Sequence, residues 1–199
     1  MSTDRDIIAR SLETPAAFSE LYDRHARRVH RFVARRAGAH VADDVMSETF
    51  LVAFERRRNF ELSRDDAMPW LYGIATTLLK KHARLEARAW RGLAAAHAAT
   101  EPHLDETDAA GDRIDAEAAM GRLGRILARM PRRDRDALLL DAWGELDYAG
   151  VADALGVPIG TVRSRLTRAR RKLRIELGAG EPRESEVEHG RAATAARSV

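Results

Sequence analysis

The segment 146–177 constrains the fold most strongly, because its pattern predicts two helices joined by a tight turn. Asp147 fits the N-cap of the first helix, and Gly156 fits its end. Pro158 then suits the first turn of the second helix. Each helix has one apolar side at helical spacing, formed in turn by Tyr148, Val151, Ala152 and Leu155 and by Ile159, Val162, Leu166, Ala169 and Leu173. We therefore expect a two-helix unit with one buried face.

The opposite side of the second helix is densely basic. Between Ile159 and Ile175 there are seven basic residues and no acidic residue. Solvated helix faces usually mix the two signs, because like charges repel at helical spacing. A helix with one apolar and one basic side, set after a short glycine turn, is what a helix-turn-helix protein inserts into the DNA major groove. The segment therefore predicts DNA binding.

The composition is that of a helical protein. The 199 residues are 45% hydrophobic and 33% charged, and no convincing strand pattern is present. The absence of cysteine excludes a disulfide framework and a thiolate metal site. No apolar run approaches the roughly 20 residues that span a bilayer, and the first residues do not resemble a signal peptide. We therefore expect an all-α, soluble, cytoplasmic protein with no membrane partner.

Changes in composition divide the chain into five parts. They are an N-terminal extension at 1–14, a helical domain at 15–91, a flexible acidic linker at 92–117, a second helical domain at 118–177 and a disordered tail at 178–199. The linker prediction rests on 101–117, where seven acidic residues and one basic residue occur. The expected fold is therefore two small helical domains joined by a flexible acidic linker.

Three helices are predicted in the first domain. The apolar pattern predicts a helix from Phe18 that ends at Gly38, and a second helix over 42–57. Pro69 opens a third helix that runs to Trp90. The outer face of the third helix is polar and basic, with Thr76, Thr77, Lys80, Lys81, Arg84 and Arg88. It is a second candidate nucleic-acid surface, far in sequence from the first.

The sequence carries no motif of catalysis or nucleotide binding. There is no GxxxxGK[ST] loop and no GxGxxG, and the histidines lack metal-ligand spacing. One cluster could hold a metal in principle, because two of its acids are one helical turn apart; it consists of His40, Asp43, Asp44 and Glu48. Acids at a helix N-terminus, or in an acidic contact surface, explain this cluster more simply. We expect no enzyme activity, no catalytic residue, no metal and no cofactor.

Four short passages carry a familiar pattern in a fixed order. They are ADDVMSETF at 42–50, similar to A-E-D-x-x-Q-E-x-F of region 2.2; PWLYGIATTLL at 69–79, similar to the region 2.3–2.4 helix; MPRRDRDALLL at 130–140, similar to L-P-x-x-x-R-x-x-L-x-L; and 146–173, similar to the region 4.2 pattern ending G-T-V-x-S-R-L-x-R-A-R. Together they resemble the sigma-70 superfamily of bacterial transcription initiation factors. The resemblance is to the small, two-domain extracytoplasmic-function (ECF, group 4) class, because regions 1.1 and 3 of larger sigma factors have no room.

The resemblance implies a sigma factor that binds core RNA polymerase and directs promoter recognition and transcription initiation at −10 and −35 elements. The first, sigma2-like domain would bind the β′ clamp helices and melt the −10 element. The second, sigma4-like domain would read the −35 element as duplex and contact the β flap. Core RNA polymerase and promoter DNA are thus the expected partners, and an anti-sigma factor is left open. The acidic linker is either a plain tether or a mimic of nucleic acid.

By the same resemblance, two surfaces of the first domain acquire roles. The polymerase contact falls on Asp44, Ser47, Glu48, Leu51 and Glu55. Acids around an apolar centre suit a basic, partly apolar partner, although Ser47 stands where the family usually has Gln. The −10 strand would follow Thr76, Thr77, Lys80, Lys81 and Arg84, with Thr77 where family members often have Asn. The loop 59–68 lies where the family captures a flipped −10 base.

In the second domain, the −35 contacts are expected on the basic helix. Base edges and nearby groups would be contacted by Arg163, Ser164, Thr167 and Arg168. Phosphates would be contacted by Thr161, Arg165, Arg171 and Lys172. The alternative function is a stand-alone helix-turn-helix transcriptional regulator with an N-terminal sensor domain. The basic helix at 70–88 argues against it, because a sensor domain needs no second nucleic-acid face.

Overall fold

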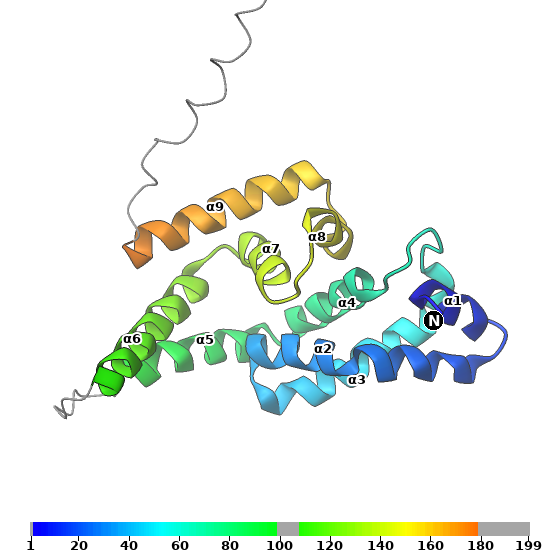
Figure 1. Cartoon of the computed structure of the whole chain (residues 1–199), viewed down its shortest axis with the longest axis horizontal. Helices are drawn as coiled ribbons and strands as arrows, with labels where there is room; N and C mark the ends of the chain where they lie inside the picture. The colour runs from blue at the N-terminus through cyan, green and yellow to red at the C-terminus, as the bar shows by residue number, and fades with distance from the viewer. Residues whose placement is uncertain (1, 99–107, 179–199) are drawn as a thin grey trace, which may run out of the picture.

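A computed structural model describes residues 2–98 and 108–178, and within these ranges the chain is helical and contains no strand (Figure 1). The helices are α1 (Asp4–Ser11), α2 (Ser19–Ala37), α3 (Ala39–Glu55), α4 (Met68–Lys81), α5 (Ala83–Ala98), α6 (Asp108–Arg129), α7 (Arg132–Ala142), α8 (Tyr148–Leu155) and α9 (Ile159–Leu177), with 3-10 turns at Pro15–Phe18 and Arg57–Asn59. This confirms the predicted all-α fold class. No helix in the described ranges is long and apolar enough to cross a bilayer.

Helices α2, α3 and α4 pack on one another and form the first domain (Figure 1). Their apolar sides meet in a core that includes Val29, Phe32, Val33, Val45, Ala53, Leu71, Tyr72, Ala75 and Leu79. The rings of Phe32 and Tyr72 lie with their centroids 4.6 Å apart. The predicted end of the first helix at Gly38 is confirmed. Its φ of 93° suits glycine, and α3 starts at the next residue.

The N-terminal segment, expected only as an extension, contains the packed helix α1. A capping box starts this helix: Asp6 N donates to Thr3 Oγ1, and Thr3 N donates to the Asp6 carboxylate. Ile7 and Ile8 are fully buried in the hydrophobic core. The sequence pattern does not predict this helix, because its buried side combines Ile7 and Ile8 with the polar residues Asp4 and Ser11, so no apolar repeat marks it.

The prediction of a single helix over 69–90 is wrong. The chain changes direction at His82 (φ −91°, ψ 20°), where α4 ends and α5 follows. The carbonyl oxygen of His82 accepts a hydrogen bond from Glu86 N at 3.0 Å, which starts the new helix. The side chain of Glu86 is thereby buried, where it binds Arg36, 50 positions away. A contact between residues so far apart cannot be predicted from the local sequence pattern.

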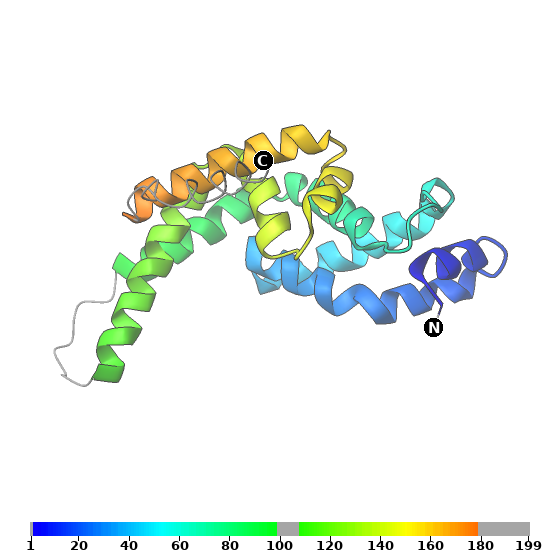
Figure 2. The same ribbon diagram turned by 45° about the horizontal axis from the view of Figure 1, so that its top comes forward.

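Helices α5 and α6 lie side by side and enter the predicted linker from its two ends (Figures 1 and 2). Residues 99–107, between the two helices, lie outside the described part of the chain. The predicted tail at 178–199 also lies outside it, except for its first residue. Trp90 of α5 is buried against Trp143, which follows α7, at a centroid distance of 5.7 Å. Thus α5 also contacts the second domain.

The second domain contains the predicted helix-turn-helix in α8 and α9. Asp147 caps α8 by accepting a hydrogen bond from Gly150 N at 2.7 Å, and Gly156 ends it in the left-handed conformation (φ 61°). Both predictions are therefore confirmed. The buried side of α9 consists of Val162, Leu166 and Ala169, with Leu173 partly buried. Ile159, predicted to lie on that side, is 42% exposed, because it occupies the first position of α9 at the end of the stripe.

The two domains pack against each other along α4 and α8 (Figures 1 and 2). They approach closely at Gly73, where a Cβ atom would lie 2.6 Å from the carbonyl oxygen of Ala154. A buried ion cluster forms a second contact. Arg36 of α2 donates to Glu86 of α5 at 2.7 and 3.0 Å, and also to Asp136 of α7. Through both contacts, the domain that carries the −10 candidate surface packs against the domain that carries the −35 candidate surface.

Candidate nucleic-acid interface

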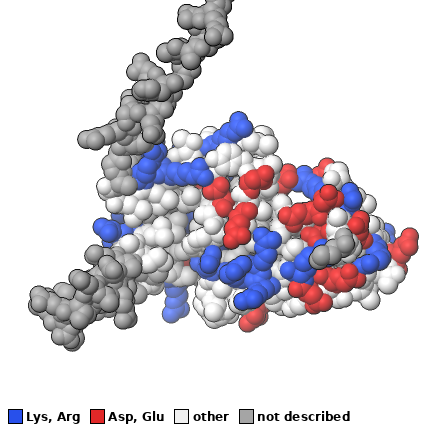
Figure 3. Space-filling model, viewed as in Figure 1, with Lys and Arg blue, Asp and Glu red and all other residues white. Residues whose placement is uncertain are grey.

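The side of α9 away from the core carries the residues expected at the −35 element. Arg163, Ser164, Thr167, Arg168 and Arg171 are exposed, and Thr161, Arg165 and Lys172 are partly buried. Figure 3 shows basic side chains along α9 on the face in view. The buried residues of the helix lie on its other side. The structure therefore brings the predicted set together on one helix surface.

Arg168 is held within its own domain. Its Nε and Nη2 atoms donate to the two carboxylate oxygens of Asp134 in α7, at 3.1 and 2.8 Å. This hydrogen bonding raises the pKa of Arg168. Arginine uses the same bidentate geometry to recognise guanine. To contact a base in that way, Arg168 has to exchange Asp134 for DNA.

Arg170 fixes α9 against its neighbouring helices, although the sequence pattern does not distinguish this residue from the other arginines. It donates to the hydroxyl of Tyr148 at 3.0 Å and to Asp141 at 2.9 Å, which joins α9 to α8 and α7. The hydrogen bond to Tyr148 raises the pKa of Arg170. These partners lie 22 and 29 positions away, so no local signal reveals the role. The basic run thus includes residues that hold the helix as well as candidates for DNA contact.

Helix α4 exposes only part of the set expected at the −10 element. The exposed members are Thr77, Lys80 and Lys81. Lys81 Nζ lies 3.0 Å from Glu48 Oε1, which links α4 to α3. Thr76 is buried and lies 3.5 Å from Arg36 Nη1, so it is not on the exposed face. The side chain of Arg84 lies outside the described part of the structure.

A small pocket lies in the loop before α4. It has a volume of about 190 Å³ and is lined by Asn59, Phe60, Glu61, Arg64, Trp70 and Asp153. The rings of Phe60 and Trp70 lie 5.2 Å apart between centroids. Arg64 donates to Glu61 at 2.7 Å, which raises the pKa of Arg64, and it also pairs with Asp153 of α8. Aromatic rings beside a cation suit an unstacked base.

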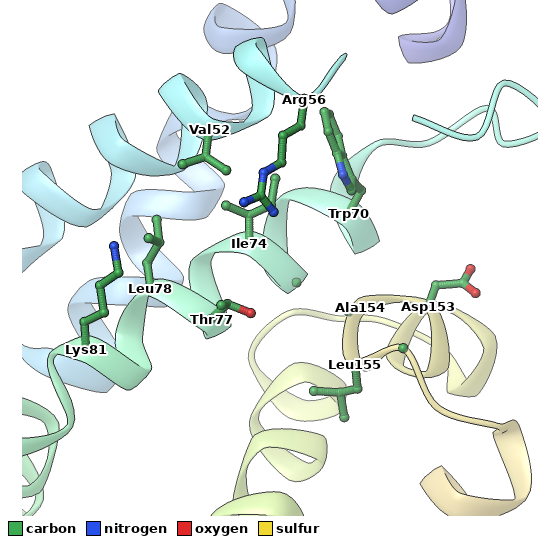
Figure 4. Close-up of a pocket in the computed structure, with 12 residues that line it drawn as sticks. Val52, Arg56, Trp70, Ile74, Thr77, Leu78, Lys81, Asp153, Ala154 and Leu155 are labelled. Carbon is green, nitrogen blue, oxygen red and sulfur yellow. The ribbon is translucent and has the colours of Figure 1, made fainter. Parts of the chain in front are cut away.

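A larger groove of about 450 Å³ runs between α4 and α8 (Figure 4). Ile74 and Thr77 line it from α4, and Leu155 lines it from α8. Arg56 and Lys81 also line the groove and add positive charge. The predicted −10 surface therefore lies directly beside the first helix of the helix-turn-helix.

One side of α3 carries the residues expected to contact polymerase. Asp44, Ser47, Leu51 and Glu55 are exposed, and Glu48 is partly buried. Leu51 is 57% exposed, although it is a large apolar residue. The structure therefore gathers acids around an apolar centre on one helix side, as the spacing predicts. Such a surface complements a basic, partly apolar partner.

The structure does not bring His40, Asp43, Asp44 and Glu48 together as metal ligands. Among the residues that the structure describes, the group of three that could hold a metal consists of Asp4, His25 and Asp66. In that group, Asp4 already accepts hydrogen bonds from His25 and from a backbone N–H. Instead, Asp43 Oδ1 lies 3.3 Å from His30 Nε2. Surface acids of α3 thus act as a charged face in this structure.

Comparisons with known proteins agree with this geometry. The Sigma-70 region 2 family matches residues 21–89, and the family "Sigma-70, region 4" matches residues 120–173. The ECF RNA polymerase sigma factor SigC of Mycobacterium tuberculosis is 34% identical over 145 residues, which cover 71% of this chain and 73% of the relative. The ECF RNA polymerase sigma factor SigE of Mycolicibacterium smegmatis is 32% identical over 162 residues, which cover 79% of this chain and 60% of the relative.

Two solved structures share the fold. CnrH in complex with the cytosolic domain of CnrY has a TM-score of 0.60 at 22% identity, and the match covers 89% of this chain and 99% of that chain. The sigma factor RpoE in complex with the anti-sigma factor NepR from Bartonella quintana has a TM-score of 0.55 at 18% identity, covering 82% and 98%. The matches to region 2 and region 4 define a two-domain protein of the sigma-70 type. The chain belongs to the sigma-70 family, in its ECF class of RNA polymerase sigma factors. This class is favoured over a stand-alone regulator with a sensor domain.

Proposed function

We propose that this sigma factor binds core RNA polymerase and directs it to promoters with −10 and −35 elements. The observation that carries the proposal is the presence of two polar, basic helix surfaces, on α4 and α9, in separate domains. Its relatives are named RNA polymerase sigma factors. In this role the protein supplies contacts and the polymerase supplies the chemistry. We therefore propose that the protein has no catalytic activity of its own and works in the cytoplasm with the polymerase.

The roles divide between the two domains. We assign 15–91 as the sigma2-like domain, which binds polymerase through the acidic side of α3 and the −10 strand through α4 and the loop 59–68. We assign 118–177 as the sigma4-like domain, which binds the −35 duplex through α9. The exposure of the α9 surface, and of Thr77, Lys80 and Lys81 on α4, supports this division. The pocket lined by Phe60, Trp70 and Arg64 supports capture of a −10 base.

A protein inhibitor is a further proposed partner. Both structural neighbours are complexes, one with the cytosolic domain of CnrY and one with the anti-sigma factor NepR. By analogy, we propose that an anti-sigma factor binds this chain. If such an inhibitor binds in the groove between α4 and α8, it would compete with nucleic acid for this surface.

Run-off transcription tests the proposed function even when the promoter sequence is unknown. The purified protein is added to bacterial core polymerase and sheared genomic DNA of the host, and the 5′ ends of the transcripts are sequenced. We expect a set of start sites that share one −35 and one −10 sequence and that are absent with core polymerase alone. The same transcripts with and without the protein would contradict the proposal.

A further inference from the structure

Helix α1 is tied to the segment that leads into α4 through one buried carboxylate. Asp4 is 4% exposed, and its Oδ2 atom accepts hydrogen bonds from Ala67 N at 3.0 Å and from His25 Nε2 at 2.7 Å. Its other oxygen, Oδ1, accepts a hydrogen bond from Arg24 Nη1 at 2.7 Å. Both oxygens of the carboxylate are therefore used, and one of their partners is the backbone of a distant loop.

Further contacts fix the residues next to Ala67. Asp4 N donates to the carbonyl oxygen of Asp65 at 3.2 Å, and the Arg5 guanidinium lies 3.0 Å from the Asp65 carboxylate. Asp66 Oδ1 accepts a hydrogen bond from Met68 N at 2.8 Å, at the start of α4. Each residue of 65–67 is thus held by a hydrogen bond or ion pair, either to α1 or to the first turn of α4.

The held segment forms one end of the loop that shapes the pocket. At the other end Phe60 is buried against Trp70, whereas Glu61, Leu62 and Ser63 between the two ends are exposed. Trp70 follows Ala67 by less than one helical turn, so the position of 65–67 sets where the tryptophan ring stands relative to Phe60. The contacts of Asp4 therefore bear on the width of the pocket.

Apolar burial of Ile7 and Ile8 already anchors α1. Desolvation offsets part of the gain when a buried carboxylate pairs with charged groups, but the hydrogen bonds are directional and fix the groups that they bind. Its directional contacts run to the loop and to α2 rather than within α1. This pattern fits a role in positioning better than a role in holding the helix.

We propose that Asp4, supported by Arg5, is a positioning residue for the pocket that captures a −10 base. This inference rests on the proposed function of the loop 59–68. Helix α1 lies outside residues 21–89, where the Sigma-70 region 2 family matches. The specificity of this protein for one −10 base thus depends on a helix that precedes the matched region.

The test compares Asp4→Asn with Asp6→Asn in polymerase holoenzyme. Both variants lose a carboxylate in the first turn of α1, but Asp6 is exposed and contacts only the helix start and Arg5. Binding is measured to promoter fragments from the run-off experiment whose −10 non-template strand is single-stranded, with each −10 base replaced in turn. We expect Asp4→Asn to lower discrimination at one base about fivefold or more. Discrimination at other bases, core affinity and the Asp6→Asn profile should stay close to wild type.

A second variant keeps the test decisive if Asp4→Asn does not fold. Arg5→Ala removes a partly exposed side chain that contacts Asp65, and we expect a smaller loss at the same base. Wild-type profiles for the folded variants, or an equal loss at every base, would overturn the inference. Failure of wild-type protein to bind core polymerase, or to discriminate any −10 base, would instead contradict the proposed function.

Discussion

At the scale of single residues, the −35 contact that we propose for Arg168 would compete with a carboxylate. Arg168 donates to both carboxylate oxygens of Asp134. The side chain of Arg168 is 53% exposed. Solvent therefore screens the ion pair and lowers the free energy needed to separate Arg168 from Asp134. A guanine offers the same two acceptors in the major groove. The pair can therefore hold Arg168 in a fixed orientation until DNA replaces the carboxylate.

Two substitutions separate a DNA contact by Arg168 from a bracing role. We expect Arg168→Ala to lower transcription from the protein's own promoters by about tenfold, with unchanged binding to core polymerase. Asp134→Asn should leave transcription unchanged or raise it, because it releases the guanidinium for DNA. Equal losses in both variants, measured by run-off transcription, would show that the pair only braces α9 against α7.

Asp4 gives the protein a defined dependence of stability on pH. Burial alone would raise the pKa of this carboxyl, but hydrogen bonds from His25 and Ala67 N, with Arg24 also nearby, lower it from 3.8 to about 2. The folded state therefore binds this proton more weakly than the unfolded chain does. The resulting stability of about 2 kcal/mol is present above about pH 4 and is lost as the pH falls through about 2.

Denaturant unfolding of wild type and Asp4→Asn at a series of pH values checks this dependence. The carboxylate of Asp66 also faces the cluster, and it is unchanged in the variant. We expect the unfolding free energy of wild type to fall by about 2 kcal/mol more than that of Asp4→Asn between about pH 5 and pH 2. Parallel curves for the two proteins would show that Asp4 does not titrate in this way.

At the scale of elements, the acidic side of α3 is a candidate docking face. Asp44→Arg places a cation where a basic partner is expected, and we expect it to lower the affinity for core polymerase at least about tenfold. The matched control is Asp43→Arg, which makes the same charge change one residue earlier, beside His30. Equal loss of affinity in both variants, measured by titration with labelled core polymerase, would mean that net charge and not this face determines binding.

The sequence predicts elements whose signals are local. The cap at Asp147, the turn at Gly156 and the apolar repeat of α9 lie within one segment, so the helix-turn-helix is found from the sequence. The break at His82 and helix α1 are not found in this way. The break accompanies a contact between Glu86 and Arg36, which are 50 positions apart. The buried side of α1 includes the polar residues Asp4 and Ser11, so no apolar repeat marks this helix. The exposed face of α4 is therefore only partly predictable.

At the scale of the whole molecule, each domain lies against a surface that we propose to be functional in the other. Helix α8 forms one wall of the groove beside α4 (Figure 4). Its Asp153 pairs with Arg64 at the loop pocket. Asp153 lines the pocket and pairs with Arg64, so a base that used Arg64 would have to displace this pair. We therefore expect the domains to separate, at least along α4 and α8, when promoter DNA binds.

The buried ion cluster gives this arrangement a testable stability. Arg36→Met removes the buried cation that Glu86 and Asp136 share, and leaves them only the longer contacts to Arg135 at 3.3 Å and to Arg132 at 4.0 Å. We therefore expect the unfolding free energy to fall by about 3 kcal/mol. The radius of gyration in solution scattering should rise, because the cluster joins the domains. Arg10→Met is the control: it removes an exposed pair with Glu20, which contributes at most about 1 kcal/mol. Unchanged stability and compactness in Arg36→Met would contradict this account.

Gel filtration of the purified protein with bacterial core RNA polymerase tests the central claim most directly, because it does not depend on the promoter sequence. We predict that wild-type protein co-elutes with core polymerase in a one-to-one complex, and that Asp44→Arg elutes mainly as free protein. If wild-type protein remains free at micromolar concentration, with no inhibitor co-purified, the proposed function is contradicted.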